Sequence, residues 1–323
     1  MHRSCLMLLT ALGLACANAD ASAQVYPSRP ITIISPFPAG GSIDVVARLL
    51  AERMRASLGQ PIIVENVTGA SGSIGTGRVA RAAGDGYTLG IGNLPTHVIN
   101  GAALRLNYDV LQDFEPVALL TTQSLLILAK NTVPAQDLRG LIDWLKANPG
   151  KASQGTSGPG SIVHLAGVLF QKETGTRFEF VPYRGNTVQE LVAGHVDLTF
   201  DLAANSLPQV HAGTVRAYAV SAGSRLAAAP GIPTVDEAGL PGFHISTWFA
   251  LFAPKATPKA VIAKLNAAVV DALADPAVRT RLADLGQEIP PLGQQTPDAL
   301  GAFHKAAIDK WWPIIKAAGV KAE

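Results

Sequence analysis

The sequence predicts an α/β protein of two lobes, each a mostly parallel sheet flanked by helices, joined by two crossover strands. Strand-like apolar runs alternate with helical periodicity along most of the chain, a pattern that favours parallel sheets covered by helices. Two long apolar runs, residues 117–129 and 245–253, have the length to pass from one lobe to the other. A chain of 323 residues is also long enough to bury two cores.

The first 23 residues have the pattern of a secretory signal peptide. Arg3 supplies a positive start, residues 6–16 are apolar, and small residues precede a cleavage site after Ala23. We therefore expect an exported protein whose mature chain begins at Gln24. Lipidation of Cys16 is the alternative, although the residue three positions before it is a glycine where a leucine is usual.

Composition excludes several classes of function. Both cysteines, Cys5 and Cys16, lie in the leader, so neither disulfides nor cysteine-ligated metals are expected in the mature chain. The histidines are dispersed, and we expect no metal and no cofactor. The formal net charge is only +2 and no basic block occurs, so nucleic acid is not an expected partner. After the leader, no stretch is apolar and long enough to cross a membrane.

The first part of the chain reads as alternating strands and helices. The helix at 45–58 is ended by Gly59 and Pro61, which are strong stop signals. Strands are predicted at 31–34, 62–65 and 87–92, and a second, shorter helix at 74–83. The long strand at 117–129 follows, interrupted by the polar residues 121–124 in a way that suits passage between lobes.

The rest of the chain builds the second lobe and returns to the first. Helices are predicted at 138–147, 162–170, 187–193, 258–273, 276–285 and 297–318. Strands are predicted at 196–200, 215–221 and 245–253, and residues 153–155 open a glycine-rich loop. This path assigns residues 24–124 and 247–323 to lobe I and residues 125–246 to lobe II.

Two glycine-rich loops each follow a strand and open a helix. The first spans residues 35–44 and the second residues 155–161. Free backbone N–H groups and the helix dipole make such a junction a site for anions. Two such loops about 120 residues apart suggest a small acid held from both sides, because open α/β sheets bind ligands at the carboxyl ends of their strands.

Several loop residues also have a purely structural interpretation. Gly40 and Gly41 are needed to turn the chain, and we expect Ser42 to cap the helix more readily than to touch the ligand. Asp44 either stabilises the helix dipole or accepts hydrogen bonds from an amino group or water on the ligand. Ser157 is expected to donate its hydroxyl to a carboxylate. A nucleophile elbow would need Gly-x-Ser-x-Gly, and a proline occupies the last glycine position.

Three further features have both a structural and a functional interpretation. The run Gly75-Thr76-Gly77 imitates a dinucleotide fingerprint, but the preceding strand ends ten residues too early, so tight helix packing is the preferred interpretation. His164 is expected to pack or cap, although it could reach the cleft. Arg184 is either a cation for carboxylate recognition or a partner in a surface salt bridge.

The motifs taken together resemble the Bug-type solute receptors of tripartite tricarboxylate transporters. The matching segments run in order along nearly the whole mature chain: residues 26–31 (Tyr-Pro-Ser-Arg-Pro-Ile), 36–44, 64–66, 69–75, 85–89, 164–167, 181–185, 194–198, 233–239 and 253–254. The resemblance implies a type II-like periplasmic binding protein fold that closes on a small carboxylated molecule. It also implies an integral-membrane permease as partner.

The resemblance further implies which residues hold the ligand. The two glycine loops grip a carboxylate, while the loop after the strand at 87–92 and the segment at 183–185 flank the rest of the ligand. The sequence departs from the family pattern at residues 93–95 and at Asn205, which puts the identity of the ligand in doubt. The expected ligand residues are Phe37, Ala39, Gly40, Gly41, Ser42, Asp44, Asn93, Thr96, Thr156, Ser157, Gly158, His164, Tyr183, Arg184 and Asp201.

We therefore interpret the chain as a monomeric periplasmic receptor that binds a small organic acid or amino acid and presents it to a permease without chemical change. Two alternatives stay open. One is a secreted hydrolase centred on Ser157, for which a nucleophile, base and orienting acid would have to lie together. The other is a sensor module that reports the ligand to a signalling protein.

Overall fold

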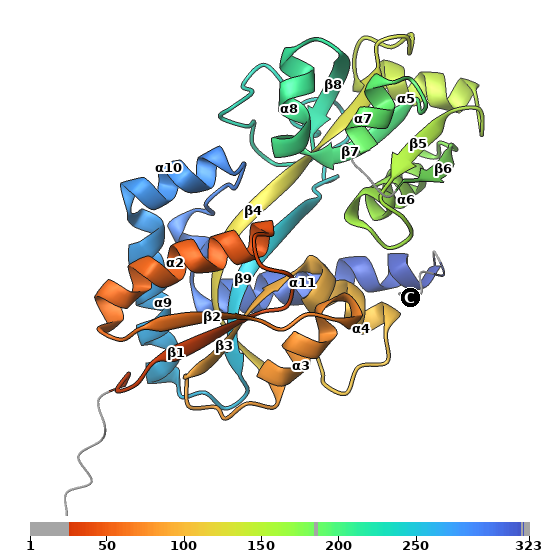
Figure 1. Ribbon diagram of the computed structural model, residues 1–323. Helices are drawn as coiled ribbons and strands as arrows, with labels where there is room; N and C mark the ends of the chain where they lie inside the picture. Colours follow the sequence, from red (N-terminus) through yellow and green to blue (C-terminus); the bar gives the residue numbers. More distant parts are fainter. Residues whose placement is uncertain (1–25, 184–186, 318, 320–323) are drawn as a thin grey trace, which may run out of the picture.

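The computed structural model describes residues 26–183, 187–317 and 319, so the expected leader lies outside them. Figure 1 shows two lobes linked by the long strands β4 (Phe114–Lys130) and β9 (Ser246–Pro254), which run side by side from one lobe to the other. The predicted α/β class, the two lobes and the crossover strands are confirmed. The boundaries between the lobes remain a prediction.

The nine strands of the described residues belong to one continuous sheet, in the order β2-β1-β3-β9-β4-β7-β5-β6, with β8 also paired to β4. In lobe I, β1 (Ile31–Ser35) lies between β2 (Ile62–Asn66) and β3 (Thr88–Asn93), and the three strands are parallel. Because β3 is antiparallel to β9, the carboxyl ends of this trio point toward lobe II.

Lobe II repeats this arrangement. Strand β5 (Ser153–Thr156) lies between β6 (Glu179–Pro182) and β7 (Leu198–Leu202), again in parallel, while β8 (Val215–Val220) runs antiparallel to β4. Because β7 is antiparallel to β4, the carboxyl ends of this second trio point toward lobe I. The two sets of strand ends therefore face each other across the hinge.

The helices begin and end where local signals place them. Gly59 ends its helix in the left-handed conformation, at φ 68°. Asp137 and Asp275 accept hydrogen bonds from backbone N–H groups in the first turn of the helices they cap. The main helices are α2 (Ser42–Leu58), α3 (Ser73–Ala80), α5 (Leu138–Ala147), α6 (Ile162–Thr174), α7 (Thr187–Val192), α9 (Lys259–Ala274), α10 (Pro276–Asp284) and α11 (Pro297–Ala317).

Several elements were not predicted from the sequence. Helix α8 (Ala203–His211) contains Pro208, which lacks an N–H and reads as a helix breaker. Strand β6 carries its own proline at its end. After β3 the chain forms a π-helical turn (Pro95–Ile99) that continues into α4 (Asn100–Ala103). The remaining short turns are 3₁₀ helices at Ala70–Gly72 and Leu292–Gln294.

Both faces of the sheet are covered. Helices α2 and α9 pack on the lobe I sheet through a cluster that includes Met54, Leu251 and Leu265. Helices α7 and α8 cover one face in lobe II, and a larger cluster under α6 and α11 extends through both lobes. Among the helices of the described residues, none is long and apolar enough to span a bilayer.

The glycines of the 75–77 run pack tightly, as preferred from the sequence. A Cβ on Gly75 would stand 3.2 Å from the Cα of Pro36 and even closer to the carbonyl of Val67. Gly77 similarly lies against Tyr108. These glycines bring α3 close to the loop that follows β1, so they help to position that loop.

Candidate functional site

The first glycine loop is exposed and ends at an uncapped helix. Gly40 has a φ of 82°, which glycine readily adopts. Gly41 is the N-cap of α2, in extended conformation, and no side chain of the described residues caps the helix. The expectation that Ser42 caps α2 was therefore wrong, because Ser42 is already the first helical residue. Orphan N–H groups at this end are available to an anion.

Asp44 holds the first loop in shape. Its Oδ2 accepts hydrogen bonds from the backbone N–H of Gly40 at 2.9 Å and from Nε of Arg48 at 3.0 Å. Its Oδ1 accepts from Nδ2 of Asn66 at 2.8 Å, and the same amide donates to the carbonyl of Phe37 at 3.0 Å. Both carboxylate oxygens are thus occupied within the loop, so the N–H of Gly40 is not free for a ligand.

The electrostatics of Asp44 fit that structural position. Burial by itself would raise the pKa of this carboxyl. Hydrogen bonds from Arg48, Gly40 and Asn66, with the nearby Arg48 charge, outweigh burial and leave the pKa below its ordinary value. Asp44 therefore stays ionised at neutral pH.

The second glycine loop is braced by its own side chains. The Thr156 hydroxyl accepts from the N–H of Gly158 at 3.3 Å. Ser161 caps α6 by accepting from the N–H of His164 at 3.2 Å, and its hydroxyl donates to the carbonyl of Gly158 at 2.8 Å. Several donors in this loop therefore already make hydrogen bonds within the loop, whereas the first N–H groups of α2 have no side-chain acceptor among the described residues.

Ser157 is exposed, and its hydroxyl makes no hydrogen bond to any residue that the structure describes. His164, the nearest histidine in sequence, accepts at Nδ1 from the N–H of Gly160 and packs edge-on against Phe180. Burial lowers the pKa of His164. The expectation that His164 packs is confirmed, and the arrangement lacks the serine–histidine pair that a hydrolase needs.

The two remaining strand ends of lobe II lie beside the second loop. The N–H of Tyr183 donates to the carbonyl of Thr156 at 2.8 Å. Asp201, at the end of β7, is 5% exposed and accepts at Oδ1 from the N–H of Leu202 and from Asn205. Burial raises the pKa of Asp201 despite these bonds. Arg184 lies outside the described residues.

The polar groups that follow β3 bond mainly to one another. Thr96 donates from its N–H to Oδ1 of Asn93 at 3.1 Å, and its hydroxyl accepts from the N–H of Asn93. The Thr96 hydroxyl also lies 2.9 Å from Nδ1 of His97. Asn93 and Thr96 are buried, so in this structure they shape the strand end rather than offer free donors.

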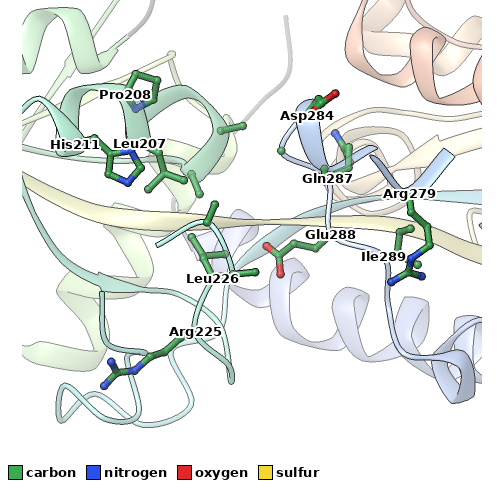
Figure 2. Close-up of a pocket in the computed structure, with 16 residues that line it drawn as sticks. Leu207, Pro208, His211, Arg225, Leu226, Arg279, Asp284, Gln287, Glu288 and Ile289 are labelled. Carbon is green, nitrogen blue, oxygen red and sulfur yellow. The ribbon is translucent and has the colours of Figure 1, made fainter. Parts of the chain in front are cut away.

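A pocket of about 810 Å³ lies at the hinge, between α8 and the segment that follows α10 (Figure 2). Leu207 and Leu226 form apolar walls on one side, and Ile289 on the other. Glu288 extends into the space between them. None of the predicted ligand residues that the structure describes lines this pocket. Gln287 in the pocket wall nevertheless contacts one of them, because its Nε2 lies 3.2 Å from the hydroxyl of Ser42.

Within the described residues, no group of three or more His, Cys, Asp or Glu side chains is placed to hold a metal ion. The two glycine loops offer hydrogen bonds from backbone N–H groups and hydroxyls, which suits an anionic ligand.

Comparison with known proteins agrees with this chemistry. The family described as tripartite tricarboxylate transporter family receptor matches residues 46–320. The chain belongs to this family. Receptors of this family are periplasmic solute-binding proteins, and this protein is likewise a solute receptor rather than an enzyme.

Individual relatives cover nearly the whole chain. BugT of Bordetella pertussis is 36% identical over 322 residues, which is 97% of this chain and 98% of BugT. MatC of Rhodopseudomonas palustris with bound malate is 39% identical, covers 90% of this chain and 100% of its own, and superposes with a TM-score of 0.70. A TctC solute-binding protein from Polaromonas without ligand is 27% identical, with coverage of 90% and 99% and a TM-score of 0.82.

The residues that support the receptor's first loop were not among those predicted from the sequence. Asn66 and Arg48 bond to each other at 2.9 Å and both bond to Asp44. Asn66 ends β2, next to β1 in a parallel sheet, so its position at a strand's carboxyl end was a usable signal. Arg48 lies one helical turn after Asp44, the spacing that brings opposite charges together.

Proposed function

We propose that this receptor binds a small dicarboxylate of the malate type between the two glycine loops. The observation that carries the proposal is the uncapped start of α2, with unsatisfied N–H groups at a strand end that faces the second loop. MatC, at 39% identity, holds malate. One carboxylate would meet the N–H groups at Ser42, and Ser157 would donate its hydroxyl from lobe II.

The remaining predicted residues take narrower roles in this proposal. Asp44 positions the first loop, and Thr156 and Gly158 shape the second. Asp201 uses only Oδ1 in its hydrogen bonds to Leu202 and Asn205, so its Oδ2 would accept a hydrogen bond from a hydroxyl or ammonium group between the carboxylates. That preference would favour a hydroxy acid or amino acid over an unsubstituted dicarboxylate. Arg184 and Tyr183 would flank the distal end.

Ligand binding would close the lobes about β4 and β9. The lobe arrangement here matches the unliganded Polaromonas receptor at a TM-score of 0.82, against 0.70 for malate-bound MatC despite MatC's higher identity. This contrast supports an open state in the absence of ligand. Closure is favoured only insofar as the acid contacts both loops in the closed form and one in the open form.

We also propose that the receptor is exported by its leader, works as a periplasmic monomer and delivers its acid to the integral-membrane permease of a tripartite transporter. A sensor role would use the same site with a signalling partner. Deletion of the permease gene separates the two, because a transport receptor loses acid uptake while a sensor keeps its transcriptional response.

Isothermal titration calorimetry tests the ligand. Malate, succinate, aspartate and malamide form the panel, because malamide keeps the malate skeleton and removes both charges. We expect binding of malate, weaker binding of succinate and none of malamide. Binding of malamide as tightly as malate would contradict recognition of carboxylates.

A further inference from the structure

The segment that follows α10 is attached to a crossover strand. The N–H of Thr122 donates to the carbonyl of Glu288 at 2.8 Å, and the N–H of Glu288 donates back at 2.9 Å. Nε2 of Gln123 lies 3.3 Å from the carbonyl of Gly286. Residues 285–289, which we call the hinge segment, thus pair with β4 where it passes between the lobes.

One side chain of the hinge segment also reaches the first glycine loop. Gln287 is 5% exposed, and its Oε1 accepts from the hydroxyl of Thr121 at 2.6 Å. Its Nε2 donates to the hydroxyl of Ser42 at 3.2 Å. Gln287 is therefore a single buried link between the start of α2 and the crossover strand, across separations of 245 and 166 residues in sequence.

Lobe II touches the same segment. A Cβ built on Gly286 would overlap the Cβ of Ala204 in α8. Only a glycine therefore lets the hinge segment and α8 approach so closely. The pocket in Figure 2 is lined by α8 on one side and by the hinge segment on the other. A change in the angle between the lobes therefore changes the surroundings of the hinge segment directly.

We propose that Gln287 is a positioning residue that couples ligand contact at Ser42 to the lobe angle, a role that rests on the proposed ligand site. An acid that takes up the N–H groups at the start of α2 alters the position of Ser42, and the Ser42–Gln287–Thr121 chain passes this change to β4. Such coupling is reciprocal, so the lobe angle in turn affects affinity at the first loop.

The matched comparison is Gln287→Leu with Gln295→Leu. Gln295 is buried to a similar degree and donates to the carbonyl of Pro290, but it makes no contact with Ser42. Both changes remove a buried amide and lower the melting temperature. We expect Gln287→Leu to weaken malate binding about tenfold, equal to about 1.4 kcal/mol, and Gln295→Leu to change it less than about twofold.

A double-mutant cycle then isolates the link. In a Ser42→Ala background, Gln287→Leu should cause no further loss of malate affinity. Equal affinities for Gln287→Leu and Gln295→Leu, or additive effects with Ser42→Ala, would overturn the inference while leaving malate binding intact. If the wild-type protein binds no acid of the panel, it is the proposed function that fails.

A ligand-free readout decides the inference in that case too. Hydrogen exchange of the Gly40 and Val45 amides, which donate to the Asp44 carboxylate and to the carbonyl of Gly41, should accelerate in unliganded Gln287→Leu and stay at the wild-type rate in Gln295→Leu. Unchanged exchange in both variants would show that Gln287 does not hold the start of α2.

Discussion

The carboxylate of Asp44 accepts the backbone N–H of Gly40 at 2.9 Å and thereby fixes the first glycine loop four residues before it. We predict that Asp44→Ala lowers the unfolding free energy by about 2 kcal/mol, the range for hydrogen bonds to a charged group. It should also weaken malate binding, because the loop loses its support. Urea unfolding and calorimetry measure the two effects. Asp284→Ala, at an exposed acid, is the control for lost charge.

The start of α2 gives the sharpest substitution. Gly41 has φ −70° and ψ 161°, a conformation any residue adopts, and its nearest neighbour for a new Cβ is the carbonyl of Pro38 at 3.4 Å. Gly41→Val should therefore fold, yet weaken malate binding about tenfold or more, at least about 1.4 kcal/mol. The malate affinity of Gly41→Ala should lie between those of the wild type and Gly41→Val. If folded Gly41→Val binds malate with wild-type affinity, the first loop only turns the chain and does not bind the ligand.

Two buried histidines predict acid sensitivity. The ring of His97 stacks on that of Phe252, with the ring centroids 4.2 Å apart. Nε2 of His304 donates to the carbonyl of His97 at 2.7 Å. Burial, reinforced for His97 by the charge of His304, lowers both pKa values below the ordinary 6.5. The folded state thus binds fewer protons than the unfolded state.

It follows that stability is complete above pH 6.5 and falls as the pH drops below that value, because protonation then favours the unfolded chain. Each histidine contributes at most about 1.4 kcal/mol per pH unit. Urea unfolding between pH 7 and pH 5 measures the slope. His97→Phe should flatten it, whereas an equal slope in that variant would place the acid sensitivity elsewhere.

Contact between Gly286 and α8 predicts an effect on the lobe angle. Gly286 has φ 65°, and an added methyl group would meet Ala204. Gly286→Ala should force α8 away from the hinge segment, changing the radius of gyration of the unliganded protein in solution scattering. Gly293→Ala, where nothing lies within 4 Å of the new Cβ, is the control. Identical scattering curves for the two variants would argue against a mechanical role for this contact.

Closure itself is measured in the same way. Saturating malate should lower the radius of gyration of the wild-type protein and raise its melting temperature once malate exceeds its dissociation constant. Stabilisation without compaction would retain binding but contradict the closing of the lobes about β4 and β9.

Much of the fold could be read from local patterns. The bounds of α5 are those predicted, because Asp137 caps its start and Asn148 with Pro149 follows its end. Helix α8 was not predicted, because its stability comes from packing on β4 and β8. This packing outweighs the unfavourable effect of the proline within the helix.

Less of the site than of the fold could be predicted from the sequence. The two loops could be located, since strand–loop–helix junctions leave a local signature. The partners of the loop residues could not, because Gln287 and Ser42 are 245 positions apart and meet only through tertiary packing. Likewise, whether Ser42 or Gly41 caps α2 depends on one backbone angle that glycine and serine both tolerate.

A crystal structure with the bound acid tests the central claim most directly. After soaking or co-crystallisation with malate, we predict one carboxylate within hydrogen-bond distance of the N–H groups at Ser42 and the Ser157 hydroxyl against the same ligand, with the lobes closed. Malate found instead in the pocket between α8 and the hinge segment, with both glycine loops unoccupied, would contradict this account.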